Sequence, residues 1–577
     1  MVTILGISCF YHDASAAIVR DGQVIAASSE ERFSRIKHDA GFPDKAIAYC
    51  CSAAGIAPID IDYVVFYEKP FLKFERIILS ILLSFPRSCL LFREAMVTWL
   101  NEKLWIRQIL QERTGVPEKN ISFCEHHQSH AASAYLCSPY QDAAILTVDG
   151  VGEWATTTFG YGSGNRFAIE QEIHFPHSLG LLYSTFTAFL GFEVNEGEYK
   201  VMGMAPYGTP RFVDKIEKLL SMHDDGSFTL DMRYFAYHYS HRRSFSKRFV
   251  QEFGSPRDPS HAEIFDTYYA DIAASIQRAI ENAAVNLCCA LYKLHPVPRL
   301  CLAGGVALNC VANEKILSRT PFTELFVQPS AGDGGGALGA ALYMHHQVLN
   351  NPRGYVMESA GLGSAYTDSD ICKILDEGNI PYHNYDNQED LFRSIAVHLA
   401  AGKVIGWFQG HAEWGPRALG YRSILADPRN PAMKDIVNSK VKFRELFRPF
   451  APAVLAEHAD EYFDFPGKQD LLLYEFMLCT VPVKETKRTV IPAVTHVDGT
   501  ARVQVVRAES NSLLHGLLKA FYGQTGVPVL LNTSFNLKGE PIVNSPEDAL
   551  ATFHRSGIDI LVMGSTVITK EQKSCVC

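Results

Sequence analysis

The stretch AAILTVDGVGEWATTTFGYGSGNRFAIEQEIHF, residues 143–175, decides the fold. An apolar run ends in the polar turn Asp149–Glu153, and two further runs suited to strands follow that turn. β-Branched and aromatic residues bounded by Gly, Asn and Asp are typical of strands joined by tight turns. The stretch therefore predicts a strand meander in which Asp149 lies at the end of a buried strand.

The beginning of the chain shows the same pattern. Residues 3–10 (TILGISCF) suit a strand, and Asp21-Gly22 between two apolar runs predicts a hairpin. A further apolar strand over residues 299–302 leads into Gly304-Gly305 and then a helix. Two meander units separated by helices predict a duplicated α/β core with a cleft between its halves. Helices are expected over residues 71–115 and 260–295.

Two domains are expected in this chain of 577 residues. Residues 350–369 carry Asn, Pro, Gly and Ser and few apolar residues, which is typical of a linker. Residues 1–350 then form the first domain. Residues 370–577 form a second α/β domain with strand candidates at 403–408, 527–533 and 558–564.

Composition excludes several classes of partner. The net charge is −10, so nucleic acid is a poor candidate partner. Met1–Leu5 enters a strand without a basic leader, and Ile77–Phe85 is too short to span a bilayer. A cytoplasmic protein is expected, and its 14 scattered cysteines are expected to be reduced thiols. The terminal Cys575 and Cys577 suit a frayed tail better than a lipid or metal site.

Four side chains suggest a metal site. His126 and His130 lie in EHHQSHAASAYL, a stretch expected to be helical, where residues four apart share one face. Taken alone, this spacing favours a pair of core or solvated histidines over a metal site. Asp149, and Asp333 in the Gly-rich PSAGDGGGALGAA, add two carboxylates. A His and Asp donor set favours Fe(II), Mn(II) or Zn(II) over Mg(II).

Other motifs suggest anion binding. Gly304-Gly305 follows a strand and opens a helix, which allows close approach of a nucleotide or simply makes a tight turn. Cations cluster with Gly, Pro and Phe in residues 413–423 and 440–449, which favours a phosphate pocket over a solvated basic face. Polar side chains of residues 532–536 follow another apolar strand.

In their order along the chain, the motifs resemble the NodU/CmcH/TobZ-type O-carbamoyltransferases. The resemblance covers nearly the whole chain and rests on HDASAA (12–17), EERFSRIKH (30–38), HHQSHAASAY (126–135), VDGVGE (148–153), EYKVMGMAPYG (198–208), AGGVALN (303–309), GDGGGALGAA (332–341), EWGPRALGYRSILADPR (413–429), FRPFAPAVL (447–455) and NTSFNLKGEPIV (532–543). It implies an N-terminal domain of the actin/Hsp70 fold, similar to threonylcarbamoyl transferases, and a YrdC-like α/β C-terminal domain.

The resemblance also implies a reaction and a set of site residues. The C-terminal domain would make carbamoyl-adenylate from carbamoyl phosphate and ATP, and Mg(II) could accompany the ATP. The N-terminal domain would transfer the carbamoyl group to a small-molecule hydroxyl such as that of a sugar or natural product. His12 becomes the catalytic acid/base. The implied metal ligands, for Fe(II) or a similar ion, are His126, His130, Asp149 and Asp333. The implied nucleotide and carbamoyl-phosphate residues are Gly304, Gly305, Asn309, Gly332, Arg417, Lys442, Arg448, Arg502, Asn532 and Ser534.

Residues 70–105 depart from the aminoglycoside-modifying members in being longer and more apolar. They suit a helical lid over a bulky or lipid-linked acceptor, a contact with a membrane surface, or an ordinary helix-packing surface. A homodimer is also compatible with the sequence. Three other functions remain open: a tRNA threonylcarbamoyl-type enzyme, an actin-fold sugar kinase and a non-catalytic binding protein. The acidic charge opposes the first, and the His and Asp set opposes the second and third.

Overall fold

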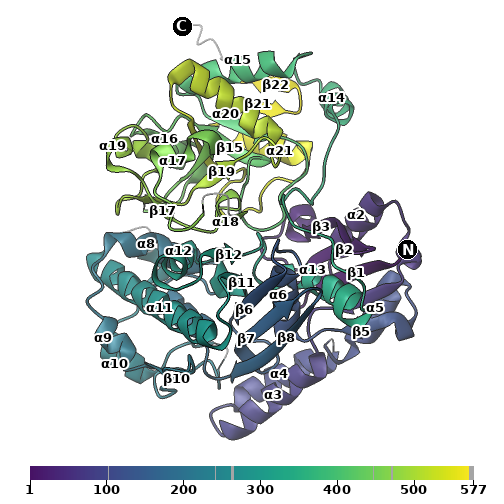
Figure 1. The fold of residues 1–577 in the computed structure, drawn as a ribbon, viewed down its shortest axis with the longest axis vertical. Helices are drawn as coiled ribbons and strands as arrows, with labels where there is room; N and C mark the ends of the chain where they lie inside the picture. Colours follow the sequence, from purple (N-terminus) through teal and green to yellow (C-terminus); the bar gives the residue numbers. More distant parts are fainter. Residues whose placement is uncertain (102, 241, 262–264, 446, 469–471, 571–577) are drawn as a thin grey trace. The chain divides into compact units, whose positions relative to one another are not determined.

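The structure, a computed structural model, describes residues 1–577 except 102, 241, 262–264, 446, 469–471 and 571–577 (Figure 1). Cys575 and Cys577 thus lie outside the described residues. The chain forms two compact units, which divide between Met357 and Glu358, inside the stretch predicted as a linker. The predicted domains were contiguous, whereas the units exchange two short segments. Glu31–Lys37 groups with the second unit, and Pro466–Leu473 groups with the first.

The first unit contains two five-stranded sheets. One has the order β3-β2-β1-β4-β5, with β1 Thr3–Ser8, β2 Ser15–Arg20, β3 Gln23–Ser29, β4 Tyr63–Phe66 and β5 Ile121–Phe123. The predicted hairpin joins β2 to β3, and both Asp21 and Gly22 have positive φ, as a two-residue hairpin turn requires.

The second sheet has the order β12-β11-β6-β7-β8, with β6 Asp142–Val148, β7 Ala155–Ser163, β8 Arg166–His174, β11 Arg299–Ala303 and β12 Glu324–Phe326. In both sheets an antiparallel three-stranded meander begins at the central strand. Two further strands run parallel to that central strand on its other side. This repeated topology confirms the predicted duplicated actin/Hsp70-like fold.

Two helices of the first unit, α6 (His126–Tyr135) and α13 (Asp333–Tyr343), pack closely against each other. Glycines permit this packing. A Cβ at Gly339 would lie 1.9 Å from the Ser129 carbonyl oxygen, and a Cβ at Gly336 would lie 2.9 Å from the Tyr67 ring. The glycine-rich sequence thus sets the start of α13 beside the start of α6.

The predicted helical section contains α3 (Pro70–Leu83), α4 (Cys89–Asn101) and α5 (Ile106–Thr114). The second predicted helix, α11, covers Thr267–Leu294 and begins where Asp266 caps its first turn, later than the expected residue 260. Among the described helices, none combines the length and the apolar character needed to cross a bilayer.

The second unit contains a mixed eight-stranded sheet of order β13-β22-β21-β14-β15-β20-β16-β19. Its strands are β13 His383–Asn384, β14 Ile405–Phe408, β15 Arg422–Ala426, β16 Ala451–Leu455, β19 Gln504–Val506, β20 Val529–Ser534, β21 Ile560–Met563 and β22 Thr566–Thr569. Helices α15 (Gln388–Ala400) and α20 (Ser512–Thr525) bury their apolar side chains with Trp407 and Leu530 of the sheet. This unit therefore has the predicted α/β class.

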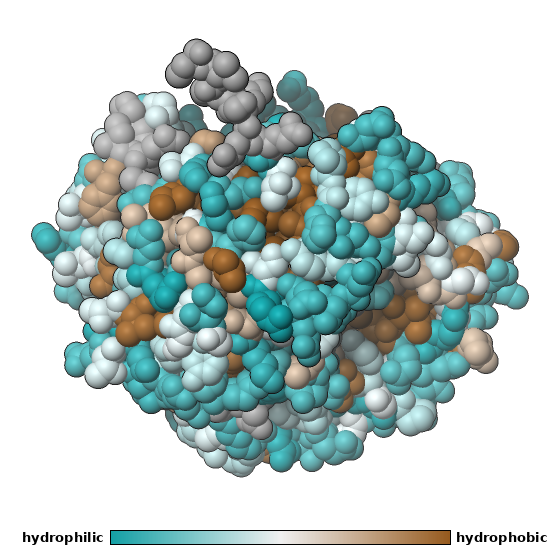
Figure 2. All heavy atoms as spheres, turned by 90° about the horizontal axis from the view of Figure 1, so that it is seen from above, coloured by the Kyte–Doolittle hydropathy of each residue, from teal (hydrophilic) through white to brown (hydrophobic). Residues whose placement is uncertain are grey.

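In Figure 2 polar residues dominate the face in view, and apolar residues form separate patches.

Candidate active site

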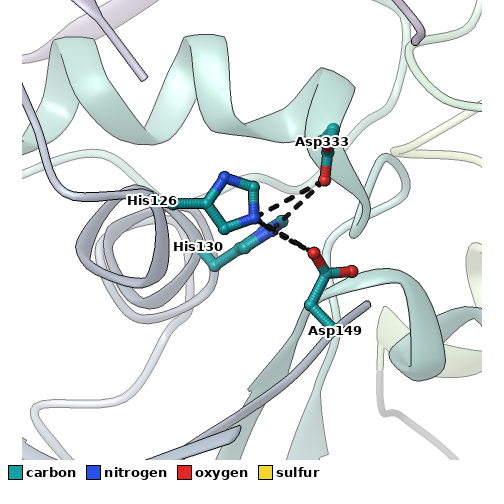
Figure 3. Close-up of side chains that lie close together, drawn as sticks. All are labelled: His126, His130, Asp149 and Asp333. Carbon is teal, nitrogen blue, oxygen red and sulfur yellow. Dashed lines mark hydrogen bonds and ion pairs between the residues drawn. The ribbon is translucent and has the colours of Figure 1, made fainter. Parts of the chain in front are cut away.

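The two histidines of the predicted metal site face each other on α6. Their Nε2 atoms lie 3.0 Å apart, and both side chains are buried (Figure 3). Residues four apart fall on one face of an α-helix, which explains the pairing. The neighbouring His127 points elsewhere, with Nδ1 2.6 Å from the Thr147 hydroxyl and Nε2 2.9 Å from the Ala155 carbonyl oxygen. His126 and His130 are thus the pair that one ion can reach.

Two carboxylates complete the cluster. Asp149 directly follows β6, and its Oδ2 lies 3.0 Å from His126 Nε2. Asp333 begins α13, and its Oδ1 lies 3.7 Å from His126 Nε2 and 3.6 Å from His130 Nε2. The Gly305 backbone N–H donates to Asp149 Oδ1 at 2.8 Å, which leaves Oδ2 directed at the histidines.

The electrostatics of the cluster reflect this proximity. Burial alone lowers the pKa of His130, but hydrogen bonds to Asp149 and Asp333 outweigh burial and raise it to about 9. Burial alone raises the pKa of Asp149, yet His126 and His130 hold it well below its usual range. The protein itself therefore binds positive charge at this point, as a proton or as a cation.

The four donor atoms fit a transition-metal ion. They lie within 4.8 Å of one another, and the four residues are buried. Ligand atoms about 2.0–2.2 Å from a metal lie roughly 3–3.5 Å from each other. His126 Nε2 lies 3.0 Å from both His130 Nε2 and Asp149 Oδ2, and the other separations, 3.6–3.8 Å, are slightly longer. Among the described residues, no hydrogen-bond partner is found for Nδ1 of His126 or His130. Those atoms carry the ring protons when the Nε2 lone pairs face an ion.

His12 lies beside this cluster, in the turn after β1. Its Nε2 is 3.7 Å from Asp333 Oδ2, and its Nδ1 is 2.9 Å from Asp13 Oδ2. Asp13 Oδ1 lies 2.8 Å from His38 Nδ1. Burial alone would lower the pKa of His12, but Asp333 and then Asp13 raise it to about 9. The side chain of His12 is 22% exposed, so it is more open to a ligand than the four buried residues.

Asp13, His38 and Glu153 received no role in the sequence analysis although all three lie in its motifs. Glu153 accepts hydrogen bonds from the backbone N–H of His126 at 3.1 Å and of Lys69 at 2.7 Å. A buried carboxylate at the N-terminus of α6 stabilises that terminus and holds the first histidine in place. In the sequence, the signal for this role of Glu153 was its place four residues after Asp149 in the same polar turn.

Two of the predicted nucleotide residues, Gly304 and Gly305, directly follow β11, which runs parallel to its neighbours β6 and β12. Gly304 has φ +93, and a Cβ there would lie 2.2 Å from the Val148 carbonyl oxygen, so this turn requires glycine. Gly332 lies near Gly305, since a Cβ at Gly332 would be 3.9 Å from Gly305 Cα. Asn309 caps helix α12 (Cys310–Arg319) and bonds to Gln277, which is a structural role.

In the second unit, Lys442 and Ser534 come together. Buried Lys442 donates to the Ser534 carbonyl oxygen and to Asn536 Oδ1, the latter at 2.8 Å. Burial and then Arg444 and Arg448 hold the pKa of Lys442 well below its usual range, so these cations lie near one another. The structure thus brings Lys442 near two arginines at the end of β20, and the arginines carry the positive charge.

Another predicted residue, Asn532, lies two residues before Ser534 on β20. The Asn532 side chain donates to the Ala418 carbonyl oxygen at 3.2 Å, beside Arg417, and to Gln504 Oε1 at 2.7 Å. Among the described residues, Asn532 Oδ1 is buried without a hydrogen-bond partner. Arg502 lies two residues before Gln504. Glu413 holds the loop through the backbone N–H groups of Leu419, Tyr421 and Arg422.

Comparisons with known proteins match both units. A carbamoyltransferase N-terminus model matches residues 3–342, and a carbamoyltransferase C-terminus model matches residues 396–570. The chain is 46% identical to the Synechocystis sp. protein sll1178, with 99% of this chain and 97% of the relative covered. It is 39% identical to the nodulation protein NolNO of Sinorhizobium fredii, over 98% of this chain and 80% of the relative.

A shorter match covers 46% of this chain and 48% of the 3'-hydroxymethylcephem-O-carbamoyltransferase of Amycolatopsis lactamdurans, at 35% identity. The resemblance found in the sequence motifs is thereby confirmed. Since the two models span most of the chain and the long matches cover nearly all of it, the chain belongs to the carbamoyltransferase family.

Proposed function

We propose that this carbamoyltransferase makes carbamoyl-adenylate from carbamoyl phosphate and ATP and transfers the carbamoyl group to a hydroxyl of a small molecule. The observation that carries the proposal is the position of His12. This partly exposed histidine is paired with Asp13 and lies at the edge of a buried His and Asp cluster. Such a pairing orients an imidazole for proton transfer, as in other His and carboxylate pairs.

In the transfer step, the acceptor oxygen attacks the carbamoyl carbon of the adenylate. The new C–O bond forms as the bond from that carbon to the phosphate oxygen breaks, and AMP leaves with the bonding electrons. His12 Nε2 would take the hydroxyl proton in the neutral form of the ring, in which Asp13 accepts the proton carried on Nδ1. Because Asp333 is the main cause that raises the pKa of His12 to about 9, a cation bound by Asp333 would favour this neutral form. A divalent cation held by His126, His130, Asp149 and Asp333 would stabilise negative charge on the carbonyl and phosphate oxygens.

In the first step, carbamoyl phosphate loses its phosphate to water. The resulting carbamate attacks the α-phosphorus of ATP and releases pyrophosphate. We assign this step to the second unit, because Arg444 and Arg448 lie near Lys442, whose amino group contacts Ser534. Phosphate-bearing ligands are recognised by such clustered cations. The buried Oδ1 of Asn532 offers an acceptor for the carbamoyl amide.

The test is the stoichiometry of ATP use. Purified protein, supplied with Fe(II) or Mn(II), is incubated with ATP and carbamoyl phosphate, and pyrophosphate, AMP and ADP are measured. We expect pyrophosphate release that requires carbamoyl phosphate. A panel of hydroxyl-bearing small molecules is then screened by mass spectrometry for gain of one carbamoyl group. ADP formation with phosphorylation of an acceptor, or pyrophosphate release without carbamoyl phosphate, would contradict the proposal.

A further inference from the structure

Helix α3 has an inverted distribution of polarity. Its buried side chains include two cations, Lys73 and Arg76, which lie one turn apart. The Lys73 ammonium contacts buried Glu68 and lies 5.0 Å from the centre of the Tyr11 ring. The opposite face exposes Phe71 and Leu79, among others. A helix of a globular protein normally buries the apolar face and exposes the charged one.

The turn between α3 and α4 extends this apolar surface. Large apolar side chains that are more than a third exposed occur along the whole of residues 71–105. They are Phe71, Leu72, Leu79, Leu82, Leu83, Phe85, Leu90, Phe92, Val97 and Trp105, which we call the hairpin patch. Leu83 is 87% exposed and Phe85 is 70% exposed at the turn. Figure 1 shows α3 and α4 at the rim of the first unit. An exposed apolar patch of this kind marks an interaction surface.

The charge around the patch is opposite to that of the whole chain. Without the buried Lys73 and Arg76, residues 69–107 carry five basic and three acidic residues, a net charge of +2, whereas the chain carries −10. Arg87 and Arg93 are exposed on either side of the apolar Leu90. Exposed apolar side chains with exposed basic residues among them are typical of segments that bind the interface of an anionic membrane.

A cavity at the base of the hairpin has the same mixed character. Its volume is about 530 Å³, and it is lined by Phe71 and Leu72 of α3 together with Lys69, Lys103 and Arg107. Arg107 and Lys69 are partly exposed, with side chains 45% and 40% accessible. Apolar walls with cations around them suit a ligand that has an apolar chain and an anionic head group, which is the chemistry of an anionic lipid.

We infer that the hairpin patch docks the protein on an anionic lipid surface. A second copy of the chain is a poorer occupant, because a symmetric contact through this patch would place its net positive charge, with the exposed Arg87 and Arg93, against an equal charge. The inner face of α3 reaches Tyr11, whose ring centre is 4.5 Å from that of His12. Docking would therefore bring the lipid surface to the helix that borders the proposed transfer site.

The test is flotation of the full chain with vesicles of phosphatidylcholine alone or mixed with phosphatidylglycerol. Wild type should bind the mixed vesicles more tightly, and added salt should weaken binding. The variant Leu82→Ser/Leu83→Ser/Phe85→Ser should bind at least about tenfold more weakly, because it removes three exposed apolar side chains. Arg87→Glu/Arg93→Glu should lose the preference for the anionic vesicles, by about fivefold or more per arginine.

The matched control is Ile59→Ser/Phe265→Ser/Leu294→Ser, which removes three exposed apolar side chains of the same unit outside the patch. It should bind vesicles as wild type does, and thermal melting verifies that all variants fold. Equal vesicle binding by wild type and the Leu82, Leu83 and Phe85 variant would overturn the inference. So would absence of binding by wild type. A dimer in analytical ultracentrifugation that this same variant converts to a monomer would assign the patch to a second copy instead.

Discussion

The Nε2 atoms of His126 and His130 lie 3.0 Å apart in a buried site, and both are also within 4 Å of Asp149 and Asp333 oxygens. Two imidazole lone pairs at this distance repel each other unless a proton or a cation lies between them. Asp149 and Asp333 favour such a positive charge, and they raise the pKa of His130 to about 9. The same arrangement can hold a metal ion, and the first two predictions follow from that competition.

Removing either histidine should empty the proposed metal site. We expect wild type to hold about one transition-metal ion per chain and His126→Ala or His130→Ala to lose it, measured by elemental analysis after dialysis. His127→Asn is the matched control, because His127 bonds to Thr147 and Ala155 instead. Full metal content in the His126→Ala/His130→Ala double variant would contradict the assignment.

Metal binding should strengthen as pH rises toward 9. Below that pH, His130 of the metal-free protein is protonated, so an incoming ion must displace a proton. For each displaced proton, affinity should fall up to about tenfold per unit of decreasing pH. Competition with a chelator between pH 6 and 9 measures this dependence, and calorimetry in buffers of different ionisation enthalpy counts the released protons. Affinity independent of pH would contradict the prediction.

The metal-free protein should become less stable as pH rises, whereas its affinity for metal should increase. A histidine with a pKa raised to about 9 in the folded state stabilises that state fully below about 6.5, the ordinary pKa of the unfolded chain. This contribution is lost as pH rises through 9. Thermal melting of chelated protein should therefore show a decreasing melting temperature from pH 6.5 to 9. In the chelated His130→Ala protein that decrease should be smaller.

His12 should affect transfer and leave adenylate formation intact. We expect His12→Ala to slow carbamoyl transfer by about 10²–10⁴-fold if it is the general base. Asp13→Asn should slow transfer by a smaller factor, because it removes the carboxylate that orients the ring. Asparagine tolerates the positive φ of Asp13, so the backbone should persist. An equal loss of pyrophosphate release in His12→Ala would show instead that His12 supports folding or nucleotide binding.

The two half-reactions should separate by unit. Arg417→Ala or Arg448→Ala should abolish pyrophosphate release that depends on carbamoyl phosphate, since each removes a cation proposed to bind that ligand. Synthetic carbamoyl-adenylate should restore transfer in both variants. The converse variant, His130→Ala, should still release pyrophosphate and should not be restored. Loss of both activities in every variant would favour a single shared site.

The sequence predicted the local geometry of the site well, because helical periodicity and strand ends depend on neighbouring residues. Residues 126–135 form the expected helix, and Asp149 directly follows the expected strand. The two exchanged segments and the start of α11 could not be predicted in this way, since they depend on which distant residues pack together. The roles of Asp13 and Glu153 also required coordinates, because each acts through a contact with a residue from another segment or turn.

The sequence by itself determined the kinds of donor atoms, the spacing that places His126 and His130 on one helix face, and the family to which the chain belongs. The sequence suggested Asp333 as a further ligand, but only the tertiary structure placed it beside the two histidines. This juxtaposition depends on glycines such as Gly339 in α13, where a side chain would collide with the backbone of α6. The tertiary structure also decided that α3 turns its cations inward. The spacing of its residues defines two faces, and only packing against Glu68 and Tyr11 selects which one is buried.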